Sequence, residues 1–241
     1  MRKTVIVTGG AKGIGESIVN YLAKDYDVIL NYNKSEENAK RIQKDLNNKG
    51  YNVNIFQADV SKREEARKLV DFAEEKFGKI DILINNAGIS QIKLFNDITD
   101  EDWDNMLHNN LYSVFYKCQE VSNYMIKQKQ GCIINISSIW GITGASCESH
   151  YAVAKAGVDA LTKSLAKELG PSNIRINSIA PGIIDTDMNK NLKEEEINNI
   201  IKEIPLEKIG KKEDISKCVE WLINDEYVTG QIISVNGGWL I

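Results

Sequence analysis

Short apolar runs alternate with segments of helical periodicity along the whole chain. The runs are rich in β-branched residues, which is typical of strands buried on both faces. They fall at 5–7, 28–30, 53–56, 80–84, 132–136, 174–179 and 231–235. Between them, apolar residues recur every three or four positions, as over 66–77, which predicts amphipathic helices. We therefore expect one α/β domain over residues 1–241, a doubly wound seven-stranded parallel sheet with helices on both faces.

One stretch departs from this rhythm, between Gly182 and Gly210. It carries an acidic, helix-like run at 194–196 between two prolines. Long insertions in α/β domains often cover a binding site, and a solvated surface excursion is the alternative. We expect a substrate lid over about residues 183–210, called the lid segment below.

The amino-acid composition argues against several classes of protein and of binding partner. With 30 basic and 34 acidic residues the net charge is −4, and no long block of one sign suggests a nucleic-acid surface. No apolar run approaches the ~18 residues of a membrane helix, and the N-terminal residues lead straight into a strand pattern. The four cysteines and two histidines lack the short spacing of a metal site. We expect a cytoplasmic protein without metal, nucleic-acid or membrane partners.

A glycine-rich turn, Thr-Gly-Gly-Ala-Lys-Gly-Ile-Gly at residues 8–15, joins the first predicted strand to a helix. Backbone N–H groups at such a turn and at the helix N-terminus can bind a pyrophosphate. The spacing Gly-x-x-x-Gly-x-Gly differs from the Gly-x-Gly-x-x-Gly dinucleotide fingerprint, and a simple tight turn is the alternative. The expected cofactor contacts here are Gly9, Lys12, Gly13, Ile14 and Gly15.

The end of the second predicted strand bears on the choice of cofactor. NAD-dependent dehydrogenases place an acidic residue there to bind the ribose 2′-hydroxyl. This chain has Asn31, Tyr32, Asn33 and Lys34 instead. With Asn33 beside them, Lys34 and Lys12 can face a 2′-phosphate, although two solvated lysines are the alternative. The pattern favours NADPH over NADH.

Tyr151 and Lys155 stand four residues apart at the start of a strongly periodic segment. On a helix both lie on one face, about 6 Å apart along the axis. A phenol with a pKa near 10 is a poor acid–base group at neutral pH unless a cation stabilises its phenolate, which Lys155 can do. Upstream, Ser137 and Ser138 follow the fifth predicted strand, at the sheet edge where doubly wound folds bind ligands.

Together these segments resemble the short-chain dehydrogenases/reductases over the whole chain. The matching motifs, in the family's order and spacing, are the turn at 8–15, Asn-Asn-Ala-Gly at 85–88, Ser138, Tyr151-x-x-x-Lys155, Pro181-Gly182 and Asn-Gly-Gly at 236–238. The resemblance implies a seven-stranded Rossmann sheet and NAD(P)-dependent interconversion of alcohols and ketones. It also implies a homotetramer.

The resemblance also implies a role for each matching catalytic residue. Tyr151 is similar to the general acid that protonates the new alkoxide. Lys155 corresponds to the residue that lowers the pKa of this tyrosine and holds the nicotinamide ribose. Ser138 resembles the donor that orients the carbonyl. Asn110 resembles the asparagine that holds a water of the proton relay, with Asn109 as the alternative.

Further cofactor contacts are implied by the resemblance alone. They are Asp59 and Val60 near the adenine, Asn86, Ala87 and Gly88 near the adenosine ribose, and Pro181, Gly182, Ile184 and Thr186, the last near the carboxamide. For Asp59 a strand-end cap is the alternative, and for Thr186 a turn hydroxyl.

Four other residues near these motifs receive plainer interpretations. We expect His150 to face the surface, because the family does not use that position. Cys147 is expected to line the pocket and Trp140 to form part of its wall. Trp239 is expected at a subunit interface.

Two subfamilies compete for the substrate. The overall pattern, including residues 183–188, resembles the 3-oxoacyl-[acyl-carrier-protein] reductases, which dock an acidic carrier through basic residues beside the cleft. Lys129 matches one such position, and the second is Ser172. Residues 137–148 resemble instead the 5-aminopentanone reductases that modify elongation factor P. The first subfamily is favoured; sugar or alcohol dehydrogenases and a non-catalytic NADP-binding regulator are further alternatives.

Overall fold

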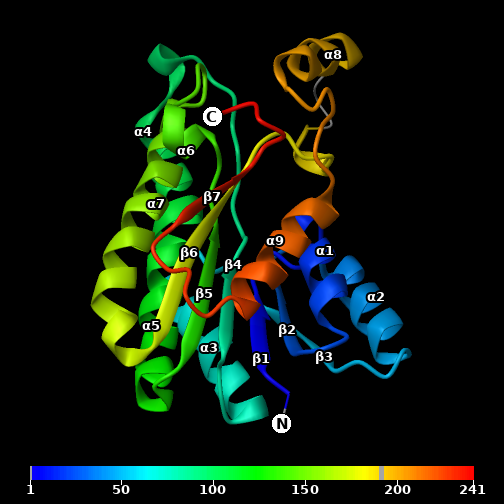
Figure 1. Cartoon of the computed structure of the whole chain (residues 1–241), viewed down its shortest axis with the longest axis vertical. Helices are drawn as coiled ribbons and strands as arrows, with labels where there is room; N and C mark the ends of the chain where they lie inside the picture. Colours follow the sequence, from blue (N-terminus) through cyan, green and yellow to red (C-terminus); the bar gives the residue numbers. More distant parts are fainter. Residues whose placement is uncertain (1, 190–192) are drawn as a thin grey trace.

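The computed structural model, which describes residues 2–189 and 193–241, contains one all-parallel seven-stranded sheet (Figure 1). Its order is β3-β2-β1-β4-β5-β6-β7. The strands are β1 (Thr4–Val7), β2 (Asp27–Tyr32), β3 (Val53–Gln57), β4 (Ile82–Asn85), β5 (Gly131–Ile136), β6 (Ile174–Pro181) and β7 (Ile232–Val235). Each overlaps one predicted strand, so the expected fold class is confirmed.

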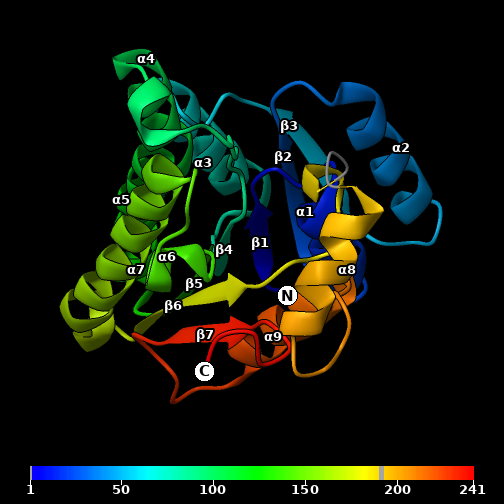
Figure 2. The same ribbon diagram turned by 90° about the horizontal axis from the view of Figure 1, so that it is seen from above.

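Helices cover both faces of this sheet (Figure 2). The α-helices are α1 (Gly13–Leu22), α2 (Glu36–Asn47), α3 (Arg63–Phe77), α4 (Asp100–Leu107), α5 (Ser113–Gln128), α6 (Trp140–Thr143), α7 (Ser149–Leu169), α8 (Glu194–Glu203) and α9 (Lys212–Asn224). One layer contains α1, α2 and α9, and the other contains α3, α5 and α7. Within the described part of the chain, no helix is long and apolar enough to cross a bilayer.

The alternation of side chains along a strand explains the two cores. In β1, Val5 and Val7 pack with residues of α1 and α9 on one face. Ile6, between them, packs with residues of α3 and α5 on the other face. Since successive side chains of a strand point to opposite faces, a strand covered by helices on both sides must be apolar throughout. The short unbroken apolar runs of the sequence follow from this arrangement.

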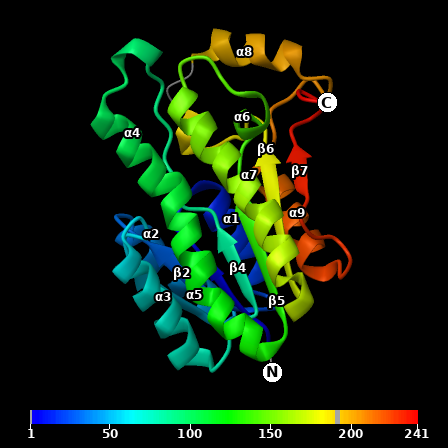
Figure 3. The same cartoon turned by 90° about the vertical axis from the view of Figure 1, so that its left-hand side faces the viewer.

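The topology brings the predicted motifs to one edge. After β3 the chain crosses back to pair β4 with β1, which creates the switch point between the two halves of the sheet. Because all strands are parallel, the segments that follow β1, β4, β5 and β6 meet at the carboxyl edge. Figure 3 shows α6 and α8 at this edge, above the arrowheads of β6 and β7.

The lid segment begins after β6, and its two ends pair with each other where they join the rest of the domain. Ile184 pairs with Gly210, and the Asp185 N–H donates to the Gly210 carbonyl at 2.9 Å. Between these ends, α8 stands above the carboxyl edge and buries none of its residues. Residues 190–192 of the predicted lid lie outside the described residues. Its action as a lid stays a prediction.

Candidate active site

The glycine turn is braced by two asparagines. Gly9 has a φ of 62°, in the left-handed region that favours glycine, and a Cβ at Gly15 would clash with the Gly9 carbonyl. Asn86 Nδ2 donates to the carbonyls of Thr8 (3.0 Å) and Gly9 (3.2 Å). The Gly9 N–H donates to Asn31 Oδ1 at 3.4 Å. Asn86 therefore supports the turn, and Asn31, which the sequence analysis did not place in the site, has the same role.

A cavity of about 200 Å³ opens beside this turn. It joins the start of α1 to the first residues of the lid segment, and it is lined by Lys12, Gly13, Glu16, Asn38, Asp185, Thr186, Asp187 and Lys212. A Cβ at Gly13 would meet nothing closer than Thr186, at 3.7 Å, so the first turn of α1 is open to this space. Its free N–H groups fit the phosphates of a dinucleotide.

The adenosine side offers cations without partners. Lys12 is the N-cap residue of α1, and Asn33 and Lys34 follow the end of β2, exposed. Neither lysine forms an ion pair with a residue that the structure describes. Asp59, by contrast, has its carboxylate engaged locally, since Oδ1 accepts from the Ser61 hydroxyl at 2.6 Å. This local hydrogen bond is the one expected if Asp59 caps the end of a strand. Contact of Asp59 with an adenine stays a prediction.

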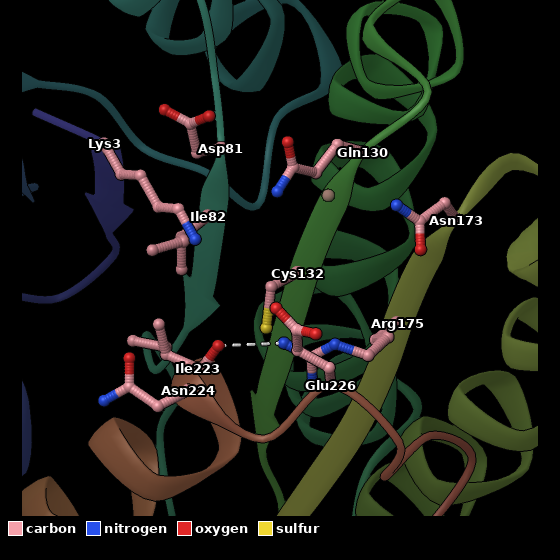
Figure 4. A pocket seen from close by; sticks show the side chains of 11 residues that line it. Lys3, Asp81, Ile82, Gln130, Cys132, Asn173, Arg175, Ile223, Asn224 and Glu226 are labelled. Carbon is pink, nitrogen blue, oxygen red and sulfur yellow. Dashed lines mark hydrogen bonds between the residues drawn. The ribbon is translucent and has the colours of Figure 1, made fainter. Parts of the chain in front are cut away.

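A second, larger cavity among the described residues lies elsewhere. It measures about 310 Å³ and lies at the amino ends of β4, β5 and β6, the edge opposite the glycine turn (Figure 4). Its most basic group, Arg175, already donates to the carbonyls of Leu222 (2.7 Å) and Ile223 (3.0 Å). The Arg175 guanidinium is thus engaged in holding the C-terminal end of α9. The volume of this cavity does not by itself make it the functional site.

Ser138, Tyr151 and Lys155 meet at the carboxyl edge, all buried. Ser138 lies just beyond β5, and the other two occupy the first two turns of α7. The Ser138 hydroxyl lies near enough to the Tyr151 hydroxyl to lower its pKa. Lys155 Nζ lies 5.6 Å from the centre of the Tyr151 ring and donates to the Ile136 carbonyl at 2.8 Å. The predicted catalytic residues are therefore brought together.

Burial shifts the pKa values of these two residues in opposite directions. It raises the pKa of Tyr151 to about 12, an effect that Ser138 opposes and Glu148 reinforces. It lowers the pKa of Lys155 to about 8, which the carboxylate of Asp159 opposes. Desolvation is the largest of these effects on the phenol, and the lowering by Lys155 that the resemblance implies stays a prediction. Tyr151 is therefore held neutral, as a proton donor.

Asn110 lies in a π-helical turn (His108–Tyr112) between α4 and α5 and is fully buried. Its Oδ1 accepts from the Ile89 N–H at 3.2 Å and its Nδ2 donates to the Ile89 carbonyl at 3.0 Å. A Cβ at Gly88 would meet both Asn110 Oδ1 and Lys155 Nζ. Asn109 instead bonds back to Asn105. Of the two candidates, Asn110 is the one beside the site.

Two tryptophans form a wall near Ser138. The Trp140 N–H donates to Ser138 Oγ at 3.2 Å, and its ring packs edge-on against Trp239, with centroids 5.2 Å apart. Trp239 Nε1 donates to Glu203 at the end of α8 at 3.1 Å. Trp239, expected at a subunit interface, thus packs within its own chain and connects the site to the lid segment.

The expectation for His150 is wrong. Its side chain is 0% exposed, because it lies at the start of α7 beneath the loop that follows β4. Its Nε2 is 2.9 Å from Gln91 Oε1. Cys147, partly exposed with a φ of 62°, accepts the Lys93 N–H through its carbonyl at 2.8 Å, which ties it to the same loop.

Lys129 does not lie beside the cleft of its own chain. It ends α5 with a φ of 54° and precedes β5 by two residues, which places it at the amino edge of the sheet. Ser138 follows the other end of the same strand. The fold therefore places Lys129 at the edge of the sheet opposite the site of its own chain.

Comparison with known proteins identifies the family of the chain. The family model described as short chain dehydrogenase matches residues 3–197. The chain is 38% identical over 241 residues to the 3-oxoacyl-[acyl-carrier-protein] reductases FabG of Staphylococcus epidermidis and Thermotoga maritima. It is 39% identical over 241 residues to that of Chlamydia muridarum. These matches cover 99% of this chain and 99%, 98% and 97% of the respective relatives.

The chain therefore belongs to the short-chain dehydrogenase/reductase family. It is an oxidoreductase that acts on CH–OH and C=O groups with a nicotinamide cofactor.

Proposed function

We propose that the protein is an NADPH-dependent ketone reductase whose substrate is a 3-oxoacyl group on acyl carrier protein. The observation that carries the reduction is the buried, neutral Tyr151 beside Ser138 and Lys155, at the edge where the glycine turn lies. The carrier-bound substrate is supported by relatives that match the chain almost end to end. A homotetramer, and a single domain with a lid over residues 183–210, belong to the same proposal.

Each catalytic side chain has a step that follows from its place. A nicotinamide cofactor, held by the glycine turn and by Lys155, would supply the hydride. The Ser138 hydroxyl donates to the substrate carbonyl oxygen and orients it. Tyr151, neutral at pH 7, donates its proton to that oxygen as the alcohol forms. The Lys155 cation stabilises the phenolate that remains, and Asn110 holds the loop at Ile89 beside them.

A second candidate, the 5-aminopentanone group on elongation factor P, is favoured by Glu148. This residue is the N-cap of α7, three positions before Tyr151, and its carboxylate is near enough to raise the pKa of the phenol. It is half-buried, and it forms no ion pair or side-chain hydrogen bond with the residues described. An unpaired carboxylate beside the proton donor suits a ketone that carries an ammonium group. Trp140 and Trp239 can add cation–π contacts.

Assays on two substrates separate the candidates. Purified protein with NADPH is offered acetoacetyl-carrier protein and, separately, elongation factor P that bears the aminopentanone. The proposed function requires a higher kcat/KM on the carrier and little effect of Glu148→Gln. The second candidate requires a higher kcat/KM on the modified elongation factor P, and this preference should be lost in Glu148→Gln. The control is Glu168→Gln, which removes an exposed charge from the same helix and should keep the preference. Inactivity on both, with NADPH bound, favours a sugar dehydrogenase or a regulator.

A further inference from the structure

The loop between β4 and α4 forms one side of the site. Ile89, just after Gly88, packs against the small apolar cluster that contains Met106, Tyr151 and Ala154. The loop contains only a short 3-10 turn (Phe95–Asp97), so side chains and backbone contacts to other segments must hold it. Asn110 secures it at Ile89, and the Cys147 carbonyl secures it at Lys93.

A chain of side-chain hydrogen bonds supplies the third attachment, midway between these two. Gln91 Nε2 donates to Asp102 Oδ1 at 2.8 Å, and Gln91 Oε1 is 2.9 Å from His150 Nε2. The other oxygen of Asp102 accepts from Lys93 Nζ at 2.5 Å. The loop is thus joined to the first turn of α4 through Asp102 and to the first turn of α7 through His150.

This network determines which nitrogen of His150 carries the proton. The Asp102 carboxylate can only accept, so the amide nitrogen of Gln91 must face it and the amide oxygen must face His150. His150 therefore donates from Nε2. Its Nδ1 is buried and has no partner among the described residues. Protonation of Nδ1 would place an unsatisfied N–H and a charge in a site with no exposed surface.

The three attachments keep several apolar side chains of the loop exposed to solvent. Ile92, Leu94 and Phe95 are 72%, 63% and 73% exposed, next to Gln91 and Lys93, which are tied down. Without the ties, burial of these side chains would favour collapse of the loop onto the body or into the cleft. The hydrogen bonds oppose that collapse.

We propose that His150 is a positioning residue that, through Gln91, holds the β4–α4 loop open beside Tyr151 so that the ketone can bind. It does not touch the reacting atoms, so its loss changes KM and leaves kcat nearly unaltered. The expected change in KM rests on the proposed ketone reduction, whereas the expected change in the loop does not.

The position also makes the loop sensitive to pH. Burial lowers the pKa of His150, an effect that Asp102 opposes and Lys93 reinforces. Glu148, the N-cap residue of its helix, and Tyr151 are ionisable groups close to it in the sequence. As the pH falls below the pKa of His150, the charged ring is disfavoured in the buried site and the loop is released. KM therefore rises at acid pH.

Three variants test the hydrogen bond itself, with ethyl acetoacetate and NADPH as the probe. Gln91→Leu and His150→Leu should raise KM by about fivefold or more, the affinity equivalent of one buried hydrogen bond, with kcat within about twofold. His150→Gln restores an N–H donor that does not titrate, so it should return KM toward the wild-type value and abolish the acid rise. His108→Gln, at the other histidine of the chain, which is exposed, is the control.

Hydrogen exchange of the free protein provides a readout that needs neither substrate nor cofactor. The amides of Ile89 and Lys93 are hydrogen-bonded across the loop, so they should exchange faster in Gln91→Leu and in His150→Leu than in the wild type. Gln91→Leu lies at a partly exposed loop position, which keeps the test informative if His150→Leu fails to fold.

The outcomes separate this inference from the proposed function. Faster exchange with raised KM and rescue by His150→Gln supports it. Unchanged exchange in Gln91→Leu, a fall in kcat alone, or no rescue by His150→Gln overturns it. Failure of the wild type to reduce any ketone contradicts the proposed function, while exchange still decides the role of His150.

Discussion

At the scale of single residues, the chemistry of the site depends on one aromatic hydroxyl. Tyr151 is buried, and desolvation keeps it protonated up to about pH 12. A neutral phenol beside Ser138 is suited to giving a proton to a carbonyl oxygen, and Lys155 is the cation of the predicted catalytic set that can stabilise the resulting anion. Loss of this one oxygen should therefore remove the proton without disturbing the packing.

We expect Tyr151→Phe to bind NADPH normally and to turn over at least about a hundredfold more slowly, since general acid catalysis contributes roughly 10²–10⁴. Steady-state kinetics and a fluorescence titration of the cofactor measure the two quantities. Turnover close to that of the wild type would exclude Tyr151 as the acid.

The cofactor preference also depends on single residues. Lys12 and Lys34 are exposed and unpaired within the described chain, and the end of β2 carries no carboxylate. We expect NADPH to bind about ten- to a hundredfold more tightly than NADH, as for charge-assisted contacts to a phosphate. Lys34→Glu should remove most of this preference and Lys49→Glu, just beyond the C-terminal end of α2, should not. Equal binding of the two cofactors by the wild type contradicts the prediction.

At the scale of elements, α5 carries an unusual buried charge. Lys117 is 0% exposed, its amine has no hydrogen-bond partner in the described chain, and burial lowers its pKa to about 7. The ordinary value is 10.5. Between these two pH values the unfolded chain binds a proton that the folded chain does not, so folding stability rises with pH over this range.

We expect Lys117→Met to raise the free energy of unfolding by at least about 1 kcal/mol at pH 7, because it replaces a desolvated amine by an apolar side chain of similar length. The gain should shrink toward pH 10, where the unfolded chain also begins to lose its proton and the difference in protonation between the two states becomes smaller. Urea unfolding at the two pH values measures it, with Lys127→Met at an exposed position of α5 as the control. A gain in the free energy of unfolding that is the same at both pH values would contradict a lowered pKa of the buried Lys117 amine.

At the scale of the whole molecule, the C-terminal tail connects the sheet to the lid segment. After β7 the chain returns across the carboxyl edge, where the Gly237 carbonyl accepts from the Leu206 N–H at 3.1 Å. Trp239 adds its bond to Glu203 and its contact with Trp140. The site wall, the tail and α8 are therefore one connected unit, although they lie up to a hundred residues apart in the sequence.

We expect Trp239→Ala to loosen α8 and to raise KM for the ketone by about fivefold, as for the loss of one hydrogen bond, with cofactor affinity unchanged. Faster hydrogen exchange in α8 should accompany this change. Trp221→Ala, at the exposed tryptophan of α9, is the matched control. An unchanged KM with unchanged exchange would show that the tail does not support the lid segment.

Features that depend on near neighbours in the chain could be predicted from the amino-acid sequence alone. Apolar period and turn composition are local properties, so the seven strands, the glycine turn after β1 and the helix that carries Tyr151 and Lys155 were predicted correctly. The shared carboxyl edge followed from the parallel topology. Burial and distance between remote segments are not local properties. Only the tertiary structure could therefore show His150 beneath Gln91, Lys129 at the far edge of the sheet, and the raised pKa of Tyr151, which follows from desolvation by residues distant in the sequence.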